Sequence, residues 1–397
     1  MIKELCTANY AGGYTFTLCG NANRTARGCG TGIYPITPQT EVVETVVKLF
    51  QELKIEKGRI FAVESEHSAL AACIGMSIEG ARTFTATSSN GALYMAENIV
   101  SASLFRLPIV MQIVNRTLGP EWNIWAEQGE SLMFRDWGWI QIYCENNQEL
   151  VDHILMGFYM SEHPKVLLPS MLNVDAFILS HNLMPTLLPT QEEADEYLPL
   201  LELPHRLTFE KPFTIGGLAL PRVTAWHRYD MERDIYNVFT VYKEAQDRFE
   251  KIFNRRPEDP VTGHFIEDAE VIFITSSTIC STTKTIIEQY RKKGHKIGMI
   301  KIKLFRPFPS EQLLHSIENV PKIGIIDRNF ALGAPNKIGG IFAQDIISVL
   351  QFSKKKPLVQ SYIAGIGGMD VTPTIIEEIV EDLIQREHSE PSLWKGL

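Results

Sequence analysis

The sequence predicts an α/β protein of two doubly wound domains, each a parallel sheet with helices on both faces. Two regions of the 397-residue chain alternate continuously apolar strands with helical segments, which is typical of strands buried on both sides. Between these regions, an acidic run over 191–196 and four prolines between 199 and 221 interrupt the alternation. We therefore expect a first domain over 1–255, with a linker or arm from about 190, and a second domain over 256–397.

The first region combines short apolar strands with helices rich in small residues. Its pattern predicts strands over 60–63, 83–87, 109–114 and 166–168, and helices over 67–76 and 91–104. Pro169 is expected to end the last of these strands, because proline lacks the backbone donor that a strand needs. Helical spacing with mixed charge then covers 229–253, after the proline-rich linker.

The second region repeats the alternation of strands and helices. Its pattern predicts strands over 271–275, 296–302, 323–327 and 358–363, and helices over 283–293, 310–317, 338–350 and 373–385. Gly294 closes the first of these helices, while Pro309 and Ser310 open the second. In folds of this kind, ligands bind at the carboxyl ends of the strands, so the loops that follow them carry the expected chemistry.

Composition excludes several classes of protein. The net charge of −9 disfavours binding to nucleic acid or to anionic membranes, which both select basic surfaces. No run of 18 apolar residues occurs, so no membrane-spanning helix is expected. The six cysteines are scattered without a C-x-x-C pair, so we expect reduced thiols in a cytoplasmic protein and no zinc, iron–sulfur or other metal site on this chain.

The loop that precedes the helix near Thr40 presents Thr37 between two prolines. Pro35 is separated from Thr37 by one residue and Pro38 follows it directly, so the threonine sits in a stiff turn. The hydroxyl then serves either as a helix cap or as a preorganised donor to a substrate oxygen, and spacing alone does not decide between the two.

Two glutamates open an almost wholly apolar helix after the strand over 60–63. Glu64 and Glu66 exceed what one cap needs, and burying a carboxylate is costly unless it is hydrogen-bonded or protonated. Beside the capping interpretation, such a glutamate suits the ring nitrogen of a bound heterocycle.

Two further loops add polar groups at strand ends. Residues 85–91 combine small hydroxyl residues with Gly91, which suits either close approach to an anion or cofactor ring or a tight connection. Arg116 comes directly off a buried strand, so it either forks a carboxylate of the substrate or pairs with a nearby glutamate such as Glu121, Glu127 or Glu130. Four tryptophans within 122–139 form either a packing cluster or the wall of an apolar pocket.

These segments, in this order, resemble the α subunit of the multi-subunit 2-oxoacid:ferredoxin oxidoreductases, most closely the pyruvate enzyme. The resemblance covers nearly the whole chain. The strings that carry it are Tyr34-Pro-Ile-Thr-Pro-Gln39, Val63-Glu-Ser-Glu-His-Ser-Ala69, Phe84-Thr-Ala-Thr-Ser-Ser89, Leu107-Pro-Ile-Val110, Asn115-Arg116, Asn123-Ile-Trp125, Gly138-Trp-Ile-Gln141, Phe305-Arg-Pro-Phe-Pro309 and Gly365-Ile-Gly-Gly-Met-Asp370.

The resemblance implies a thiamine-diphosphate-dependent enzyme that oxidatively decarboxylates pyruvate, or runs in reverse, with coenzyme A and ferredoxin. It implies a pyrimidine-binding-type domain followed by a transketolase C-terminal-like domain. The chain lacks a Gly-Asp-Gly segment with a following Asn-Asn pair and lacks a ferredoxin-type cysteine run. By resemblance, Mg²⁺ and the diphosphate are therefore shared with a β subunit, and the [4Fe-4S] clusters lie on the other subunits, of β, γ and δ type.

The resemblance also assigns residues. Glu66 matches the glutamate that holds N1′ of the aminopyrimidine, Thr37 matches a substrate-contacting threonine, and Arg116 matches the arginine near the substrate carboxylate and carbonyl. We expect the cofactor to contact Glu66, Ser88, Ser89 and Asn90. We expect the substrate pocket to be lined by Tyr34, Pro35, Thr37, Arg116, Trp122, Glu127 and Gln128.

Two departures from the family pattern lie close to this expected pocket, and the first is the stretch Thr117-Leu-Gly-Pro-Glu-Trp122. Where the family pattern has Asp-His-Ser-Asp after Asn-Ile-Trp, this chain has Glu127-Gln-Gly-Glu130. Aromatic, branched-chain and 2-oxoglutarate substrates therefore stay open beside pyruvate, with added tryptophans such as Trp122 and Trp137 suiting a bulkier acid. A subunit without catalytic function, used for assembly or docking, is the remaining alternative.

Overall fold

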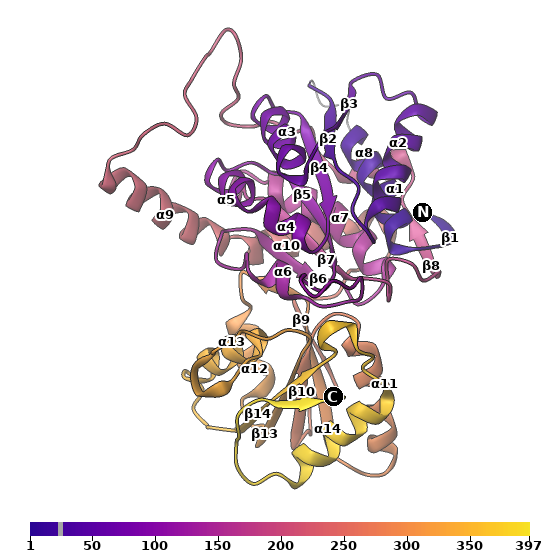
Figure 1. The fold of residues 1–397 in the computed structure, drawn as a ribbon, viewed down its shortest axis with the longest axis vertical. Coiled ribbons are helices and arrows are strands. Elements are labelled where there is room, and N and C mark those ends of the chain that lie inside the picture. The colour runs from indigo at the N-terminus through magenta and orange to yellow at the C-terminus, as the bar shows by residue number, and fades with distance from the viewer. Residues whose placement is uncertain (23–26) are drawn as a thin grey trace.

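Two sheets with mostly parallel strands form the two halves of the molecule (Figure 1). The computed structural model describes residues 1–22 and 27–397. In the first sheet the strand order is β12-β6-β7-β5-β4-β2-β3, and every neighbouring pair is parallel except β12 with β6. The strands are β2 (Cys29–Ile33), β3 (Gly58–Ala62), β4 (Arg82–Thr87), β5 (Val110–Asn115), β6 (Ile140–Tyr143), β7 (Ser170–Asp175) and β12 (Leu304–Arg306).

Helices cover both faces of this sheet, as the apolar strands require. One core cluster lies under α1, α2 and α7, and another lies under α3 and α5. The helices are α1 (Ala8–Asn21), α2 (Thr40–Glu52), α3 (Glu66–Ile78), α4 (Asn90–Tyr94), α5 (Ala96–Leu104), α6 (Gly129–Leu132) and α7 (Asn147–Glu162). A two-stranded antiparallel sheet of β1 (Ile2–Cys6) and β8 (Met184–Leu188) flanks them.

An arm leaves the first half within the proline-rich stretch, whereas the acidic run expected to begin the arm forms a helix that packs on α1 and α10. After α8 (Gln191–Tyr197), residues 198–220 contain neither helix nor strand. The following helix α9 (Pro221–Ile235) extends away from the sheets together with the preceding loop (Figure 1), and Met231 is its one buried side chain. The next helix, α10 (Val238–Phe253), packs against α7 and returns the chain to the body.

The second sheet has the order β15-β14-β13-β10-β11-β9, with only β9 antiparallel to its neighbour. Helices α12 and α13 cover one face, while α11 and α14 cover the other. The strands are β9 (Val261–His264), β10 (Val271–Thr275), β11 (Ile297–Ile302), β13 (Lys322–Asp327), β14 (Leu358–Ala364) and β15 (Leu393–Lys395). The helices are α11 (Ile279–Lys292), α12 (Ser310–Ile317), α13 (Ile341–Leu350) and α14 (Pro373–Gln385).

The two halves are tied together by a strand and by a buried carboxylate. β12 leaves the second half and pairs with β6 at the edge of the first sheet. Asp175, at the end of β7, accepts hydrogen bonds from the Ser277 hydroxyl at 2.7 Å and from the Gln128 amide at 3.0 Å, and Arg328 lies 3.4 Å from it. The halves therefore form one continuous contact around the ends of β6 and β7.

Three sequence predictions need correction. The strand expected over 166–168 is wrong, because Leu167 has a φ of +44° in the turn after α7, and the strand β7 begins only at Ser170. The helix expected over 91–104 is two helices, α4 and α5, which meet at Met95. The helical span over 229–253 is likewise divided into α9 and α10. No helix in the described ranges is long and apolar enough to cross a lipid bilayer.

Candidate active site

The predicted catalytic residues come together at one edge of the first sheet. Strand β2 lies between β3 and β4, so the chain winds outward in opposite directions on its two sides. This arrangement is a topological switch point, where the loops separate and leave a crevice at the carboxyl ends of the strands. The loops after β2, β3, β4 and β5 carry Thr37, Glu66, Ser88–Asn90 and Arg116 respectively.

Glu66 is the buried one of the two glutamates. It is the first residue of α3, whose N-cap is Ser65, and its side chain is only 8% exposed. The Glu66 carboxylate lies against Gly91, since a Cβ added there would come within 2.8 Å of Glu66 Oε1. Glu64 is exposed and accepts a hydrogen bond from the Ser68 hydroxyl. Of the two glutamates, Glu66 is therefore the better candidate for the site, because it is buried and lies against Gly91.

Arg116 connects the loop after β5 to the loop after β2. Its guanidinium donates to the backbone carbonyl of Thr37, so this contact uses the threonine main chain and not its hydroxyl. The α2 N-cap is Gln39, so Thr37 is not the helix cap. Burial lowers the pKa of Arg116, while the charges of Glu130 and Glu66 act in the opposite direction. The side chain is therefore a buried cation that faces two carboxyl groups.

The loop over 88–90 is hydrogen-bonded to the loop after β5. The Ser88 hydroxyl donates to the Val114 carbonyl at 2.6 Å, and the Ser89 hydroxyl donates to the Thr117 carbonyl at 2.6 Å. The Asn90 side chain exchanges two hydrogen bonds with the backbone of Gly119, at 3.0 and 3.2 Å. These bonds fix the two loops to each other, and cofactor contact by this loop stays a prediction.

Glu130 is a site residue that sequence reasoning considered only as an ion-pair partner of Arg116. Its side chain is fully buried, and Oε1 accepts from the Arg116 N–H at 2.7 Å and from the Ser89 N–H at 3.4 Å. Burial raises the pKa of Glu130 to about 8. No sequence signal distinguished it from the other glutamates of this loop.

Several residues of the expected substrate pocket are bonded to the second half of the molecule or lie at the surface. Glu127 accepts a hydrogen bond from the Gly367 N–H at 2.9 Å, and the Gln128 amide donates to Asp175. Both side chains therefore bond at the contact with the second half, and their part in the substrate pocket stays a prediction. Trp122 is 67% exposed and packs on Gly119, Tyr34 packs partly buried on the core, and Pro35 is exposed.

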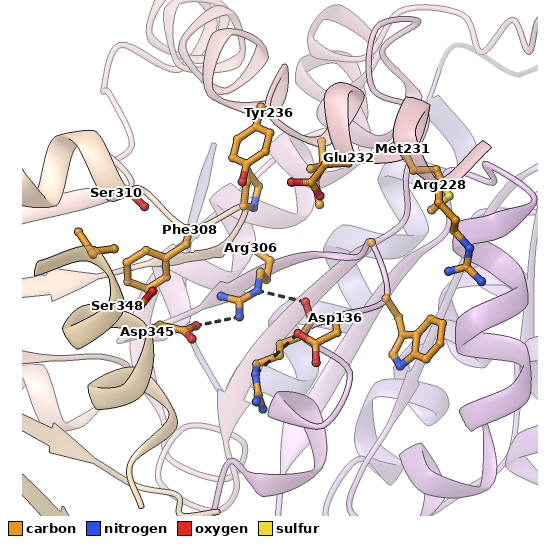
Figure 2. Close-up of a pocket in the computed structure, with 16 residues that line it drawn as sticks. Asp136, Arg228, Met231, Glu232, Tyr236, Arg306, Phe308, Ser310, Asp345 and Ser348 are labelled. Carbon is orange, nitrogen blue, oxygen red and sulfur yellow. Dashed lines mark hydrogen bonds and ion pairs between the residues drawn. The ribbon is translucent and has the colours of Figure 1, made fainter. Parts of the chain in front are cut away.

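The tryptophans do not form one cluster. Trp139 is buried in the core and Trp125 is half exposed. Trp137 lines a cavity of about 510 Å³ between α9, β12 and α13, where Arg228 lies 5.5 Å from its ring. Figure 2 shows this cavity, with Arg306 paired to Asp345 on its wall. Neither Glu66 nor Arg116 lines it, so it is separate from the candidate site.

Comparison with known proteins identifies the family. Residues 26–247 match the family model "Pyruvate flavodoxin/ferredoxin oxidoreductase, thiamine diP-bdg", which covers more than half of the chain. Residues 269–376 match "Pyruvate:ferredoxin oxidoreductase core domain II". The chain belongs to the pyruvate flavodoxin/ferredoxin oxidoreductase family. It is an α subunit of the 2-oxoacid:ferredoxin oxidoreductase type, as the resemblance implied.

Curated relatives of this oxidoreductase subunit span almost its whole length. The chain is 39% identical to ketoisovalerate oxidoreductase subunit VorA of Pyrococcus abyssi, over 96% of this chain and 93% of the relative. It is 37% identical to pyruvate synthase subunit PorA of Methanothermobacter thermautotrophicus, over 100% of this chain and 99% of the relative.

Solved structures support the two-domain fold. A 2-oxoglutarate:ferredoxin oxidoreductase from Magnetococcus marinus, with 2-oxoglutarate, coenzyme A and succinyl-CoA bound, superposes with a TM-score of 0.70 at 18% identity, over 96% of this chain and 65% of that one. A split-gene transketolase, an inactive β4 tetramer, superposes with a TM-score of 0.56 at 10% identity, over 96% of this chain and 99% of that one. The oxidoreductase subunit thus has the predicted fold of a thiamine-diphosphate-binding domain and a transketolase C-terminal-like domain.

The residues at the switch point fit the pyrimidine half of thiamine diphosphate. Glu66 offers a buried carboxylate that lies against Gly91, and the absence of a side chain at Gly91 lets the carboxylate take this position. Within the described ranges there is no group of three or more His, Cys, Asp or Glu side chains placed to hold a metal ion. That Glu66 holds the heterocycle stays a prediction.

Proposed function

We propose that this chain supplies the pyrimidine-binding and 2-oxoacid-binding half of an oxidoreductase that converts a 2-oxoacid, coenzyme A and oxidised ferredoxin into acyl-CoA, CO₂ and reduced ferredoxin. The observation that carries this proposal is the convergence of Glu66 and Arg116, both buried, at the switch point of the first sheet. An assembly subunit without catalysis has no need to keep both charges out of water there.

Each residue has a role that its contacts support. Glu66 hydrogen-bonds N1′ of the aminopyrimidine and holds or shares a proton at that atom. Arg116 binds the carboxylate of the 2-oxoacid, because a guanidinium can donate two parallel hydrogen bonds to a carboxylate. The Nε atom of Arg116 is buried and has no hydrogen-bond partner among the described residues, so it is available for this contact. Thr37 fixes the guanidinium through its carbonyl, which holds Arg116 next to the loop after β2. When bound, thiamine diphosphate supplies the carbon nucleophile and the electron sink for decarboxylation.

The remaining half of the cofactor site is proposed to lie on a β subunit, which brings Mg²⁺ and the diphosphate contacts. Exposed aromatic side chains support this: Tyr94 on α4 lies next to His67 and is 60% exposed, and Phe61 on the edge strand β3, which leads into α3, is 46% exposed. Exposed aromatic side chains around a binding site are typical of a surface that another chain covers.

The arm supports a larger assembly with γ and δ subunits and ferredoxin, the iron–sulfur clusters lying on those chains. Phe209 and Leu218 are fully exposed, and α9 exposes Trp226 and Tyr229. A helix of this length is marginal in water without tertiary packing, so a partner chain is expected to stabilise it. All six cysteines are free thiols, which supports a cytoplasmic place for the complex.

Pyruvate is the first candidate substrate, and a branched-chain 2-oxoacid is the second. The pyruvate candidate rests on the motif strings and on the pyruvate synthase relatives at 37% identity. The branched-chain candidate rests on a specific observation, since the relatives at 38–39% identity are ketoisovalerate oxidoreductase subunits. The two groups of relatives differ by only one or two per cent in identity, so a substrate panel is used to distinguish the two acids.

The test is made on the complex purified with its partner subunits under anaerobic conditions. Coenzyme A-dependent viologen reduction is measured for pyruvate, 2-oxoisovalerate, 2-oxoglutarate and an aromatic 2-oxoacid. We expect a clear preference for pyruvate or for 2-oxoisovalerate. Replacement of Arg116 by alanine is expected to lower kcat/KM for that acid by about 100-fold or more, as loss of a charged hydrogen-bonded contact of about 3 kcal/mol predicts.

Arg135→Ala is the matched control, because Arg135 lines the separate cavity. This substitution is expected to keep kcat/KM within about threefold of the wild-type value. Unchanged kcat/KM in Arg116→Ala would remove Arg116 from the substrate site. No activity with any acid, despite bound thiamine diphosphate, would favour the assembly subunit.

A further inference from the structure

Glu130 is a buried carboxyl group that the proposed chemistry does not use. It lies at the start of the short helix α6 and is fully buried, and it faces the loops that carry Arg116 and Ser89. Sequence comparison with the family pattern placed a glutamate here where an aspartate is expected. Its place behind the candidate site raises the question of what the side chain does.

One oxygen of Glu130 holds two loops. Oε1 accepts from the backbone N–H of Arg116 at 2.7 Å and from that of Ser89 at 3.4 Å. Ser89 has a φ of +50°, which is unfavourable for a residue with a side chain, so a fixed acceptor for its N–H helps to hold that turn. The carboxyl group therefore sets the position of the β5 loop relative to the β4 loop.

The other oxygen has no partner. Glu130 Oε2 and Arg116 Nε are both buried, and neither has a hydrogen-bond partner in the part of the chain that the structure describes. An unpartnered oxygen costs far more on an ionised carboxylate than on an uncharged acid, because a buried charge loses its hydration. This geometry favours the uncharged form, and burial correspondingly raises the pKa of Glu130 to about 8.

We propose that Glu130 is a positioning residue that fixes Arg116 and Ser89 through their backbone N–H groups and, as an uncharged acid, leaves the Arg116 guanidinium free for the carboxylate of the 2-oxoacid. This inference rests on the proposed function. An ionised Glu130 weakens the attraction between the guanidinium and the substrate carboxylate, because its negative charge acts on Arg116 in a buried environment. Substrate affinity is therefore expected to fall as Glu130 ionises.

The groups that act on this pair come from four elements. The Asn115 amide faces Glu130 from the end of β5, and the Arg116 N–H faces it from the residue that follows. The Ser89 N–H faces it from the loop after β4, and Tyr143 faces it from β6. Glu66, on α3, acts on Arg116. Burial raises the pKa of Tyr143 well above its ordinary value, so Tyr143 does not titrate between pH 6 and 9.

The test compares Glu130→Gln with the wild-type complex between pH 6.5 and 9. In the wild type, KM for the preferred 2-oxoacid is expected to stay constant below about pH 8 and to rise by about tenfold per pH unit above it. In Glu130→Gln the amide oxygen still accepts the two N–H groups but cannot ionise, so KM is expected to stay flat across this pH range. Glu130→Ala removes the acceptor and is expected to lower kcat as well.

Glu79→Gln, an exposed glutamate at the end of α3, is the matched control and should keep the wild-type profile. A Glu130→Gln complex that keeps the wild-type rise in KM would overturn the inference, as would a wild-type KM that does not change up to pH 9.

A second readout needs no turnover. The infrared difference spectrum between wild-type and Glu130→Gln complexes is expected to show the carbonyl band of a protonated carboxyl group at pH 7 and to lose it by about pH 9. Absence of the band at pH 7 would contradict an uncharged Glu130. A complex that shows the band but oxidises no 2-oxoacid would overturn the proposed function and leave the uncharged state of Glu130 standing.

Discussion

At the scale of single residues, the candidate site depends on the space next to Glu66. Gly91 lies in the first turn of α4, and a Cβ added at this position would lie 2.6 Å from Thr87 Oγ1 and 2.8 Å from Glu66 Oε1. Contacts this short force a neighbour to move, and the end of the Glu66 side chain is the part that gives way most easily. The Glu66 carboxylate can thus take its position because Gly91 has no side chain.

We predict that Gly91→Ala displaces the Glu66 carboxylate and lowers kcat by about 10- to 100-fold, since small misplacements of a reacting group are costly. The cost in stability is expected to be about 1–3 kcal/mol, which leaves the protein folded. Steady-state kinetics and thermal unfolding measure the two effects. Gly157→Ala is the control within α7, where the nearest atom would be 3.5 Å away. Equal effects of both substitutions on kcat would argue against this role of Gly91.

Residue types alone could not predict how Arg116, Thr37 and Glu130 interact. The sequence indicated that Thr37 and Arg116 belong to the site, but it left open that they meet through the Thr37 carbonyl. Glu127 and Glu130 are three positions apart in one loop, yet only Glu130 turns toward Arg116 while Glu127 binds Gly367. Which way each glutamate faces depends on the packing of the second half, and local sequence does not contain that information.

At the scale of elements, apolar strands were the easiest to predict, because both faces of the sheets are covered. The strand over 271–275 and the helices over 310–317 and 373–385 match β10, α12 and α14 in both bounds. Strands β6 and β7 were hard to recognise in the sequence, because the buried polar residues Gln141 and Asn173 interrupt their apolar pattern. The amides of these two residues donate to main-chain carbonyls at 3.0 and 3.1 Å, which offsets the cost of burying them.

Helix α1 gave no recognisable pattern for a related reason. It is buried on nearly all sides, so apolar residues do not recur with helical spacing. Gly13 lets α1 approach α2 closely, since a Cβ there would lie 2.7 Å from the Val42 carbonyl oxygen. A glycine disfavours a helix when only the sequence is considered, and the close contact between α1 and α2 explains why Gly13 occurs there.

At the scale of the whole molecule, a buried cluster of charges lies between α7, β11 and the segment that leads into β9. Lys303 is 1% exposed and lies 3.0 Å from Glu149 and 3.1 Å from Glu258. Lys301 binds Glu149 at 2.7 Å. Burial raises the pKa of Glu149, but Lys303 and Lys301 outweigh that effect and lower it to about 2. The halves are therefore joined by charges that depend on one another.

We predict that Lys303→Met lowers the free energy of unfolding at pH 7 by about 3–5 kcal/mol, because it leaves a buried carboxylate short of a partner. Below its ordinary pKa of 4.5, Glu149 becomes protonated in the unfolded chain but stays ionised in the folded one. Its contribution to stability is thus complete above about pH 4.5 and is lost as the pH falls toward 2. Lys303→Met is expected to weaken that dependence, as urea unfolding at several pH values would measure.

The exposed Lys284→Met on α11 is the matched control and is expected to change the free energy of unfolding by less than about 0.5 kcal/mol. A loss of stability in Lys303→Met no larger than in this control would show that the cluster does not stabilise the contact between the halves.

The measurement that tests the central claim most directly is turnover by a Glu66→Gln complex with its partner subunits present. The account predicts that coenzyme A-dependent reduction of viologen by the preferred 2-oxoacid is abolished while the complex still assembles, because glutamine cannot hold or release a proton at N1′. Glu64→Gln, two residues away and exposed, is expected to keep wild-type activity. Near-normal turnover by Glu66→Gln would contradict the assignment of this edge of the sheet as the active site.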